Sequence, residues 1–289
     1  MKVAIVTDSN SGISQKEAKE LGINVIPMPF LINGEEYFEE VSLSQAEFYE
    51  KLFADADVST SQPNIYTVVD LWKKLLKTYD EIVHIPMSSA LSASMETATT
   101  FAKEFDGKVQ VVDNKRISIT QKQSVYDAIK MAKDGKSAKE IKEWLEKTSM
   151  NSSIYIMVTT LKYLKKGGRV TPAAAALGSL LKIKPILAIQ GGKLDKFAQV
   201  ISYQQGKKRM IDQITKEIET RFQNELKAGK LKVAVAYTYV TDKANEFVKE
   251  INEAFAKYNL EVCMIDPLSL SVSCHIGDGS IAIGCFISY

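Results

Sequence analysis

The chain has 289 residues, of which 45% are hydrophobic and 25% charged, so it is long enough for two domains with sizeable cores. Its 37 basic and 35 acidic residues leave a formal charge of +2 and alternate along helix-like segments such as 139–147, which excludes a stripe that binds nucleic acid. The sequence shows neither a signal-peptide core nor an uncharged stretch of membrane-spanning length, so we expect a cytoplasmic protein without stable membrane insertion.

The first half of the chain alternates between short β-branched runs and segments with helical periodicity. Near-continuous apolar strands joined by helices predict an α/β fold with a doubly wound parallel sheet, covered on both faces. Capping boxes at Ser44 to Glu47 and Ser137 to Glu140 mark helix starts, and Asn33-Gly34 predicts a hairpin. The expected strands are 2–7, 23–28, 81–85, 109–112 and 154–158, and the expected helices are 65–79, 91–105 and 120–133.

After about residue 150 the pattern changes, because five strand-like runs are interrupted by only two long helices. Gly191-Gly192 predicts a hairpin between two of these strands. We therefore expect a second α/β domain with a mixed sheet and helices on one face, and we divide the chain into domains 1–150 and 151–289. The expected strands are 184–189, 193–203, 232–237, 260–265 and 280–287, and the expected helices are 207–222 and 241–258.

Two hydroxyl-rich turns lie where a strand-like run gives way to a helix-like run. They are Ser59-Thr60-Ser61-Gln62-Pro63 and the segment from Pro86 to Ser94. The first N–H groups of a helix carry partial positive charge, so hydroxyl groups beside them complete a neutral cradle for a carboxylate or a phosphate. Ser and Thr are also the preferred N-cap residues, and capping alone accounts for most such clusters. The presence of two such turns favours an anion site.

Other polar residues have a functional and a structural interpretation. Asp8 follows the first strand, where we expect a cap and not a catalytic carboxylate, and Asp113 is ambiguous in the same way. Arg169 follows a Gly-Gly pair and either binds the last carbonyls of a helix or faces an anion. His275 is expected in a glycine-flanked loop before the final strand, which makes it a better site candidate than His84 on an apolar strand.

The sequence offers little support for a metal or a cofactor. Cys263, Cys274 and Cys285 have no Cys-x-x-Cys spacing and are expected to be buried thiols. His84 and His275 are the only histidines, and no third ligand is paired with them in spacing. Neither a Walker A loop nor a Gly-x-Gly-x-x-Gly motif is present, so we expect no ATP or NAD to be held by this chain.

Six motifs occur in order along essentially the whole chain. They are Thr7-Asp8-Ser9, residues 59–63, 85–92, 164–169 and 181–187, and His275-Ile276-Gly277. Together they resemble the DegV family of bacterial fatty-acid-binding proteins. The resemblance implies a two-domain α/β protein that holds a long-chain fatty acid, such as palmitate, in a buried tunnel between its domains. It also implies that the lipid is bound without catalysis and presented to a separate ATP-dependent kinase subunit, which converts the carboxylate to an acyl phosphate.

The resemblance also implies roles for individual residues. Thr60 and Ser92 bind the carboxylate, with Ser61 and Ser94 beside them, and His275 completes the polar end of the site. It further implies that Arg169 acts in phosphoryl transfer or in docking to the kinase.

The chain departs from the family pattern at two places. Asp278 stands where the family commonly has the proline of Gly-Pro-Gly, and residues 199–202 contain no arginine where the family tends to have one. A kinase partner is therefore less firmly implied than lipid binding.

Two other functions fit the same residues. The first is an acyl or phosphoryl hydrolase with His275 as base and Ser92 as nucleophile, although the chain has no Gly-x-Ser-x-Gly elbow and no clear third triad member. The second is a lipid-responsive regulatory protein, which would have the same pocket.

Overall fold

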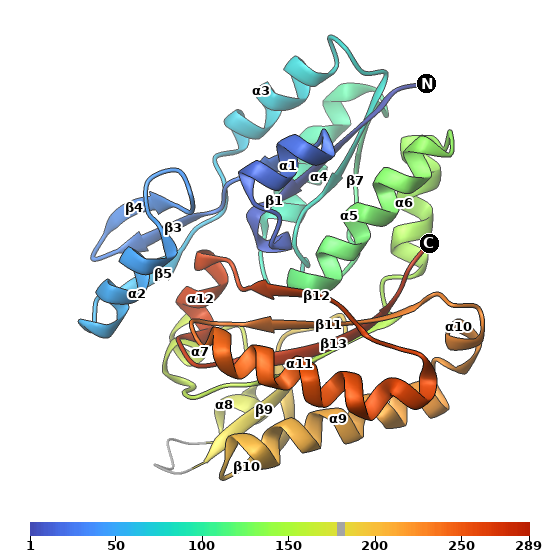
Figure 1. Cartoon of the computed structure of the whole chain (residues 1–289). Helices are drawn as coiled ribbons and strands as arrows, with labels where there is room; N and C mark the ends of the chain where they lie inside the picture. The colour runs from blue at the N-terminus through green and yellow to red at the C-terminus, as the bar shows by residue number, and fades with distance from the viewer. Residues whose placement is uncertain (178–182) are drawn as a thin grey trace. The chain divides into compact units, whose positions relative to one another are not determined.

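The computed structural model describes residues 1–177 and 183–289 (Figure 1). The chain divides into two compact units. The first comprises Met1–Met150 with Ser269–Ser271 and Tyr289, and the second comprises Asn151–Leu268 with Val272–Ser288. The chain therefore returns twice to the first unit after it leaves that unit at residue 150.

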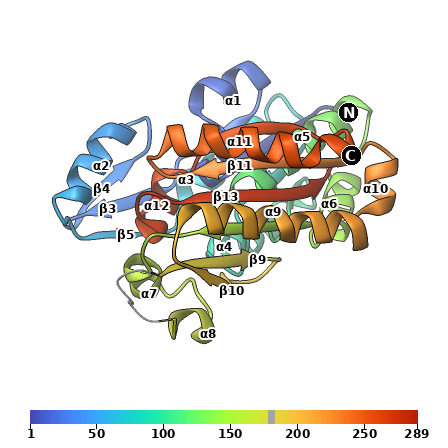
Figure 2. The ribbon, with the colours of Figure 1, turned by 60° about the horizontal axis from the view of Figure 1, so that its bottom comes forward.

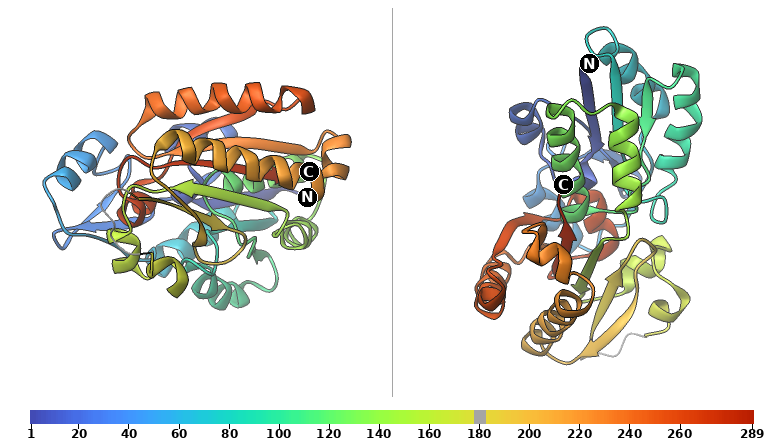
Figure 3. Two further views of the ribbon diagram at one scale, coloured as in Figure 1. Left: turned by 90° about the horizontal axis from the view of Figure 1, so that it is seen from below. Right: turned by 90° about the vertical axis from the view of Figure 1, so that its right-hand side faces the viewer.

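The first unit is built on a four-stranded parallel sheet. Its order is β2 (Asn24–Ile26), β1 (Val3–Asp8), β6 (Glu81–Ile85) and β7 (Val109–Val111). One face packs against α1 (Gln15–Leu21), α5 (Ser118–Lys133) and α6 (Ala138–Lys147), and the other against α3 (Ile65–Leu75) and α4 (Ser94–Ala102), as the right-hand view of Figure 3 shows. The predicted doubly wound sheet is confirmed.

The two faces of this sheet follow from the alternation of side chains along each strand. On β1, Ile5 belongs to the core under α1, α5 and α6, whereas Ala4 and Val6 belong to the core under α3 and α4. Trp72 is fully buried in the second of these cores. Both faces are apolar because helices cover both of them.

A small three-stranded antiparallel sheet also belongs to the first unit, in the order β4 (Glu35–Phe38), β3 (Pro29–Ile32) and β5 (Val58–Thr60), accompanied by α2 (Gln45–Phe53). The predicted hairpin at Asn33-Gly34 is confirmed, and both residues have the positive φ, 52° and 84°, of a type I′ turn. The prediction of a turn was wrong for Ser59 and Thr60, because their backbones pair with β3 and extend a strand.

The second unit contains a six-stranded mixed sheet. Its order is β10 (Asp195–Val200), β9 (Lys184–Ile189), β8 (Ser152–Met157), β13 (Ile281–Ile287), β11 (Leu231–Tyr237) and β12 (Val262–Pro267), and among these only β11 and β12 are parallel neighbours. Helices α9 (Tyr203–Thr220) and α11 (Thr241–Phe255) lie side by side across one face (Figure 2). This arrangement confirms the predicted mixed sheet.

Shorter elements complete the described chain. They are η1 (Ser9–Ser11), η2 (Lys103–Phe105), α7 (Lys162–Gly167), α8 (Pro172–Ala175), α10 (Gln223–Lys227), η3 (Ala256–Tyr258) and α12 (Leu270–Ile276). No helix in the described parts of the chain has the length and apolar character needed to span a membrane.

Two sequence-based expectations were wrong, those for His275 and Cys263, and one motif lies partly outside the described residues. His275 does not lie in a loop but in the last turn of α12, because helical hydrogen bonding continues up to Gly277, whose φ of 77° ends it. Cys274 and Cys285 are buried as expected, but Cys263 on β12 is exposed. The motif at 181–187 begins with two residues that lie outside the described part of the chain.

Candidate functional site: a pocket at the carboxyl edge of the parallel sheet

The polar segments of the first unit meet between β1 and β6, where the strand order of the parallel sheet reverses. From β1 the chain moves outward to β2, and from β6 it moves outward on the other side to β7. The helix after β1 packs on one face of the sheet, and the helix after β6 packs on the other. In open α/β sheets such a reversal opens a crevice beyond the carboxyl ends of the strands, and ligands bind there.

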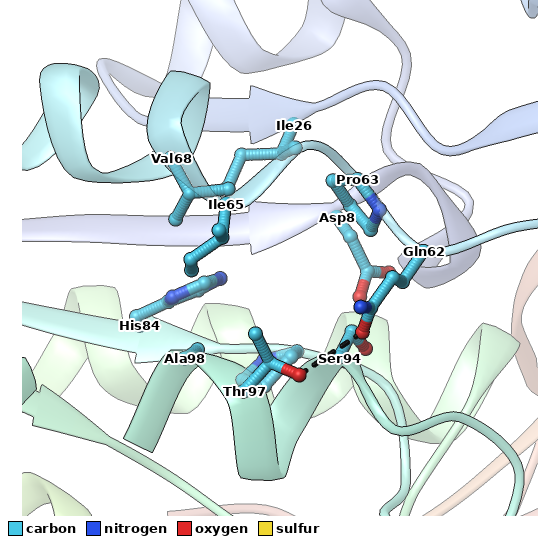
Figure 4. Close-up of a pocket in the computed structure, with 11 residues that line it drawn as sticks. Asp8, Ile26, Gln62, Pro63, Ile65, Val68, His84, Ser94, Thr97 and Ala98 are labelled. Carbon is cyan, nitrogen blue, oxygen red and sulfur yellow. Dashed lines mark hydrogen bonds between the residues drawn. The ribbon is translucent and has the colours of Figure 1, made fainter. Parts of the chain in front are cut away.

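A pocket of about 320 Å³, counting space open to solvent, lies at this place. Gln62 from the first hydroxyl-rich segment and Ser94 from the second lie beside Asp8 at one end of it, and an apolar wall forms the other end (Figure 4). Thr97 Oγ1 donates a hydrogen bond to Gln62 Oε1 (3.1 Å), which joins the first segment to α4 across the pocket. The remaining lining residues are Ile26, Pro63, Ile65, Val68, His84, Pro86 and Ala98.

Helix capping does not account for most of the hydroxyl groups in the two segments. The N-cap of α3 is Asn64, whose Oδ1 accepts from Tyr66 N (3.0 Å), and the N-cap of α4 is Ala93, which makes no side-chain cap. Ser88 Oγ accepts from Ala90 N (3.3 Å) and Ser92 Oγ accepts from Ser94 N (3.2 Å), so these two serines are used in local hydrogen bonds. By contrast, Ser44 and Ser137 form both predicted capping boxes.

Asp8 is the buried charge of the pocket, with only 2% of its surface exposed. Its Oδ1 accepts from Asn10 N (3.0 Å) and Gln121 Nε2 (3.2 Å), and its Oδ2 accepts from Met87 N (2.7 Å). The predicted cap is confirmed, since Asp8 caps η1. Burial outweighs the three hydrogen bonds and raises the pKa of Asp8 to about 6.

Two further polar groups of the pocket lack partners. Neither Ser94 Oγ nor His84 Nδ1 has a hydrogen-bond partner among the described residues, although both atoms are buried. The His84 ring packs edge-on against Trp72, with 5.5 Å between ring centroids, and burial lowers the pKa of His84 to about 3. His84 is therefore neutral near pH 7 and adds no charge to the pocket.

Of the predicted carboxylate-binding residues of the first unit, one lines this pocket. Ser94 lines it, whereas Thr60, Ser61 and Ser92 do not, although each lies within two residues in sequence of Gln62 or Ser94. Sequence reasoning did not select Gln62, because its amide stands among hydroxyl groups in the motif.

Arg169 and His275 are brought together in the second unit. Arg169 Nη1 donates to Gly167 O at the end of α7, which is the structural interpretation given above for an arginine after a helix. Burial lowers the pKa of His275 to about 4, and the positive charge of Arg169 contributes to the shift. His275 is therefore neutral near pH 7. A Cβ atom on Gly167 would lie only 2.1 Å from His275 Nδ1, so the glycine makes room for the ring.

The segment after His275 is held to its own unit by its backbone. Thr159 Oγ1 donates to Asp278 O (2.8 Å), and the Tyr203 hydroxyl donates to Gly279 O. Lys184 and Lys243 lie over the Tyr203 ring, with Nζ 4.9 and 4.1 Å from its centroid. The chain therefore replaces the family's proline with Asp278 while this turn remains anchored.

The start of α12 is bound to the pocket residues of the first unit. Asn10, whose backbone N–H donates to Asp8, accepts hydrogen bonds at its Oδ1 from Ser269 Oγ (2.9 Å) and from Ser271 Oγ. Glu39 Oε2 accepts from Leu270 N (2.8 Å). These contacts explain why residues 269–271 belong to the first unit.

A metal site finds no support in the described residues, where no three His, Cys, Asp or Glu side chains are grouped to hold an ion.

The fold and the pocket thus define a two-unit α/β protein with an amphipathic pocket at the edge of a parallel sheet, and comparison with known proteins identifies its family. The model of the DegV family, described as "Uncharacterised protein, DegV family", matches residues 2–288. The chain belongs to the DegV family, as the motifs indicated.

Relatives match over nearly the whole chain. A DegV domain-containing protein of Staphylococcus aureus (strain N315) is 31% identical over 283 residues, covering 98% of both chains. One from Halalkalibacterium halodurans is 30% identical over 289 residues, covering 99% of both.

Two solved structures share the fold. The fatty acid binding DegV family protein of Streptococcus agalactiae matches with a TM-score of 0.86 and 25% identity, and DegV of Bacillus subtilis, described as a fatty acid binding protein, matches with a TM-score of 0.85 and 27% identity. Each comparison covers 100% of both chains.

The close approach of Gly167 to His275 gives a first prediction. We expect Gly167→Ala to displace the imidazole from its buried position, so the pKa of His275 rises from about 4 toward that of an exposed histidine. A pH titration of the imidazole Cε1–H signals by NMR measures this, and assignment is simple because the chain has only two histidines.

The matched control is Gly192→Ala, since no atom lies within 4 Å of a Cβ placed there. This variant should leave the His275 titration as it is in the unmodified protein. A Gly167→Ala protein with an unchanged His275 titration would contradict the packing described here.

Proposed function

We propose that this protein is a non-catalytic carrier that binds a long-chain fatty acid, such as palmitate, and presents its carboxylate for conversion to an acyl phosphate. The observation that carries the proposal is the amphipathic pocket at the carboxyl edge of the sheet, formed by both hydroxyl-rich segments. Two solved relatives that are described as fatty-acid-binding, and are 25% and 27% identical over the whole chain, support it.

The chemistry of the pocket suits an acid with an alkyl chain. A carboxyl group needs convergent hydrogen-bonding groups, which Ser94 and Gln62 offer at the polar end, and methylene groups need an apolar wall. Each buried CH₂ contributes about 0.8 kcal/mol. With polar groups at one end and apolar side chains at the other, the pocket suits a head group and the methylenes next to it.

Thr60 and Ser92 are the residues that we propose to hold the carboxylate, with Ser61 and Ser94 beside them. Neither segment supplies a hydroxyl group as the N-cap of the helix that follows it, which supports this assignment. We also assign His275 to the polar end of the ligand, where its neutral ring can donate a hydrogen bond without adding charge.

A separate ATP-dependent kinase subunit is the proposed partner. Phosphoryl transfer to a carboxylate creates negative charge that is absent from the resting complex, and a guanidinium stabilises such charge. Arg169 suits this role because it lies beside His275 at the end of α7.

Lipid content is the direct test. We expect denaturing extraction and mass spectrometry of the purified protein to release a long-chain fatty acid, and added palmitate to raise the melting temperature of delipidated protein, because a ligand that binds only the folded state stabilises it. A protein that releases no acyl chain and does not respond to palmitate would refute the proposal. Turnover of an acyl ester or acyl phosphate by the protein alone would instead indicate a hydrolase.

The proposed carboxylate ligands give a second test. A hydrogen bond to a charged group contributes about 1.5–3 kcal/mol, so Thr60→Val and Ser92→Ala should each weaken palmitate binding roughly tenfold or more while the protein stays folded. Calorimetric titration and circular dichroism measure the two properties.

Ser59→Ala is the control for Thr60→Val, because successive side chains on β5 point to opposite faces. We expect its affinity to equal that of the unmodified protein. Full affinity in both the Thr60 and the Ser92 variants would place the head group elsewhere.

The role of Arg169 in transfer is separable from lipid binding. We expect Arg169→Ala to retain palmitate but to lose most acyl-phosphate formation when a kinase subunit from the same organism and ATP are supplied, because the guanidinium acts on charge present only during transfer. The measurement is acyl phosphate trapped with hydroxylamine. Lys165→Ala, an exposed residue on the short helix α7 that precedes Arg169, is the control and should support normal transfer. Loss of bound lipid from Arg169→Ala would place Arg169 in the binding site instead.

A further inference from the structure

We infer that the pocket of the first unit binds the acid group of its ligand together with one proton, which the ligand carboxyl shares with Asp8. The inference rests on the proposed function and specifies the form in which the head group binds.

The hydrogen-bond donors and acceptors that line the pocket favour a head group that binds with one proton. The Asp8 carboxylate offers only acceptors, and its Oδ2 accepts one hydrogen bond from the described residues, from Met87 N. An ionised ligand carboxylate beside it would add a second negative charge in a buried place, which is unfavourable. A proton between the two groups replaces that repulsion with a strong O–H···O⁻ hydrogen bond.

The second oxygen of the ligand carboxyl has donors on the other side of the pocket. Ser94 Oγ is buried and has no hydrogen-bond partner among the described residues. Gln62 uses its Oε1 to accept from Thr97, which directs its NH₂ group to other acceptors. Figure 4 shows Ser94 and Gln62 beside Asp8 at the same end of the pocket. Acceptor and donors are thus arranged as a neutral carboxylic acid requires.

Among the described residues, the groups that line the pocket or hydrogen-bond to Asp8 are uncharged. Helix α5 contributes Gln121, α4 contributes Ser94, the segment before α3 contributes Gln62, and the turn after β6 contributes a backbone N–H. His84 on β6 is the other titratable group lining the pocket and is neutral, since burial lowers its pKa to about 3. Without a neighbouring cation, burial sets the pKa of Asp8 at about 6.

The inference predicts that palmitate binding depends on pH. Above about pH 6 both Asp8 and the free fatty acid are ionised, so binding takes up one proton and the Kd rises roughly tenfold per pH unit. The Kd should therefore rise roughly 100-fold from about pH 6.5 to about pH 8.5. Asp8→Asn should abolish this rise, because an amide donates to the carboxylate at every pH, and at the higher pH it should bind palmitate more tightly than the unmodified protein.

Asp127→Asn is the matched control. Asp127 on α5 is likewise 2% exposed, and burial likewise raises its pKa, but it does not line the pocket. This variant should keep the pH dependence of the unmodified protein. Palmitamide, which has the same chain but a neutral head group, should bind the unmodified protein equally well at both pH values.

Calorimetry of the unmodified protein tests the inference even if Asp8→Asn does not fold. Titration with palmitate in buffers of different ionisation enthalpy should show uptake of about one proton per ligand near pH 7.5. Binding with no proton uptake and a Kd that is constant with pH would overturn the shared proton while leaving lipid binding intact. If neither palmitate nor palmitamide binds at any pH, the proposed function itself fails.

Discussion

The parallel pairing of β1 with β6 is the constraint on which the candidate site depends. Its register places Thr7 opposite Ile85, so Asp8 and the turn that begins at Pro86 leave the sheet side by side. Thr7 Oγ1 donates to Ile85 O (2.8 Å), and Met87 N donates to Asp8 across the same edge. A shift of one residue would turn the side chains of β1 to the opposite faces and remove Asp8 from the pocket. The apolar alternation that builds the two cores therefore also positions the carboxylate.

Burying the Asp8 carboxylate costs desolvation free energy that its hydrogen bonds do not fully offset. Three hydrogen bonds favour its ionised form, yet desolvation still raises its pKa. A structural cap for η1 does not need a charge, because the side chain of Asn caps as well as that of Asp. Retaining a carboxylate at 2% exposure, with an unpartnered Ser94 hydroxyl in the same pocket, is what a binding site requires and a core does not.

The sequence predicted most of the architecture because its signals are local. Period-two and period-3.6 patterns located the strands of the two larger sheets and the long helices, and the Ser44 and Ser137 capping boxes and the Asn33-Gly34 turn are as expected. The errors arose from non-local pairing. Ser59 and Thr60 form a strand only because β3 lies beside them, and the short helix containing His275 has no apolar period long enough to detect.

The site was predicted only in part for the same reason. Hydroxyl-rich segments and strand ends are visible in a sequence. A sequence does not show, however, that Asn64 is the N-cap of α3, so that the preceding hydroxyl groups do not cap this helix. Nor does it show that Gln62 meets Thr97 of another helix. Asp8 was correctly predicted as a cap, and only its burial among uncharged groups indicates more.

Asn10 links Asp8 to residues 269–271, which belong to the same unit. It donates its backbone N–H to Asp8 and accepts from Ser269 and Ser271 with its side chain, so a single residue orients the carboxylate and fixes the start of α12. That helix is only seven residues long. A helix this short has little stability of its own, so the hydrogen bonds from Ser269 and Ser271 to Asn10 hold its start within the first unit. The residue that orients Asp8 therefore also explains why these distant residues of the chain return to the first unit.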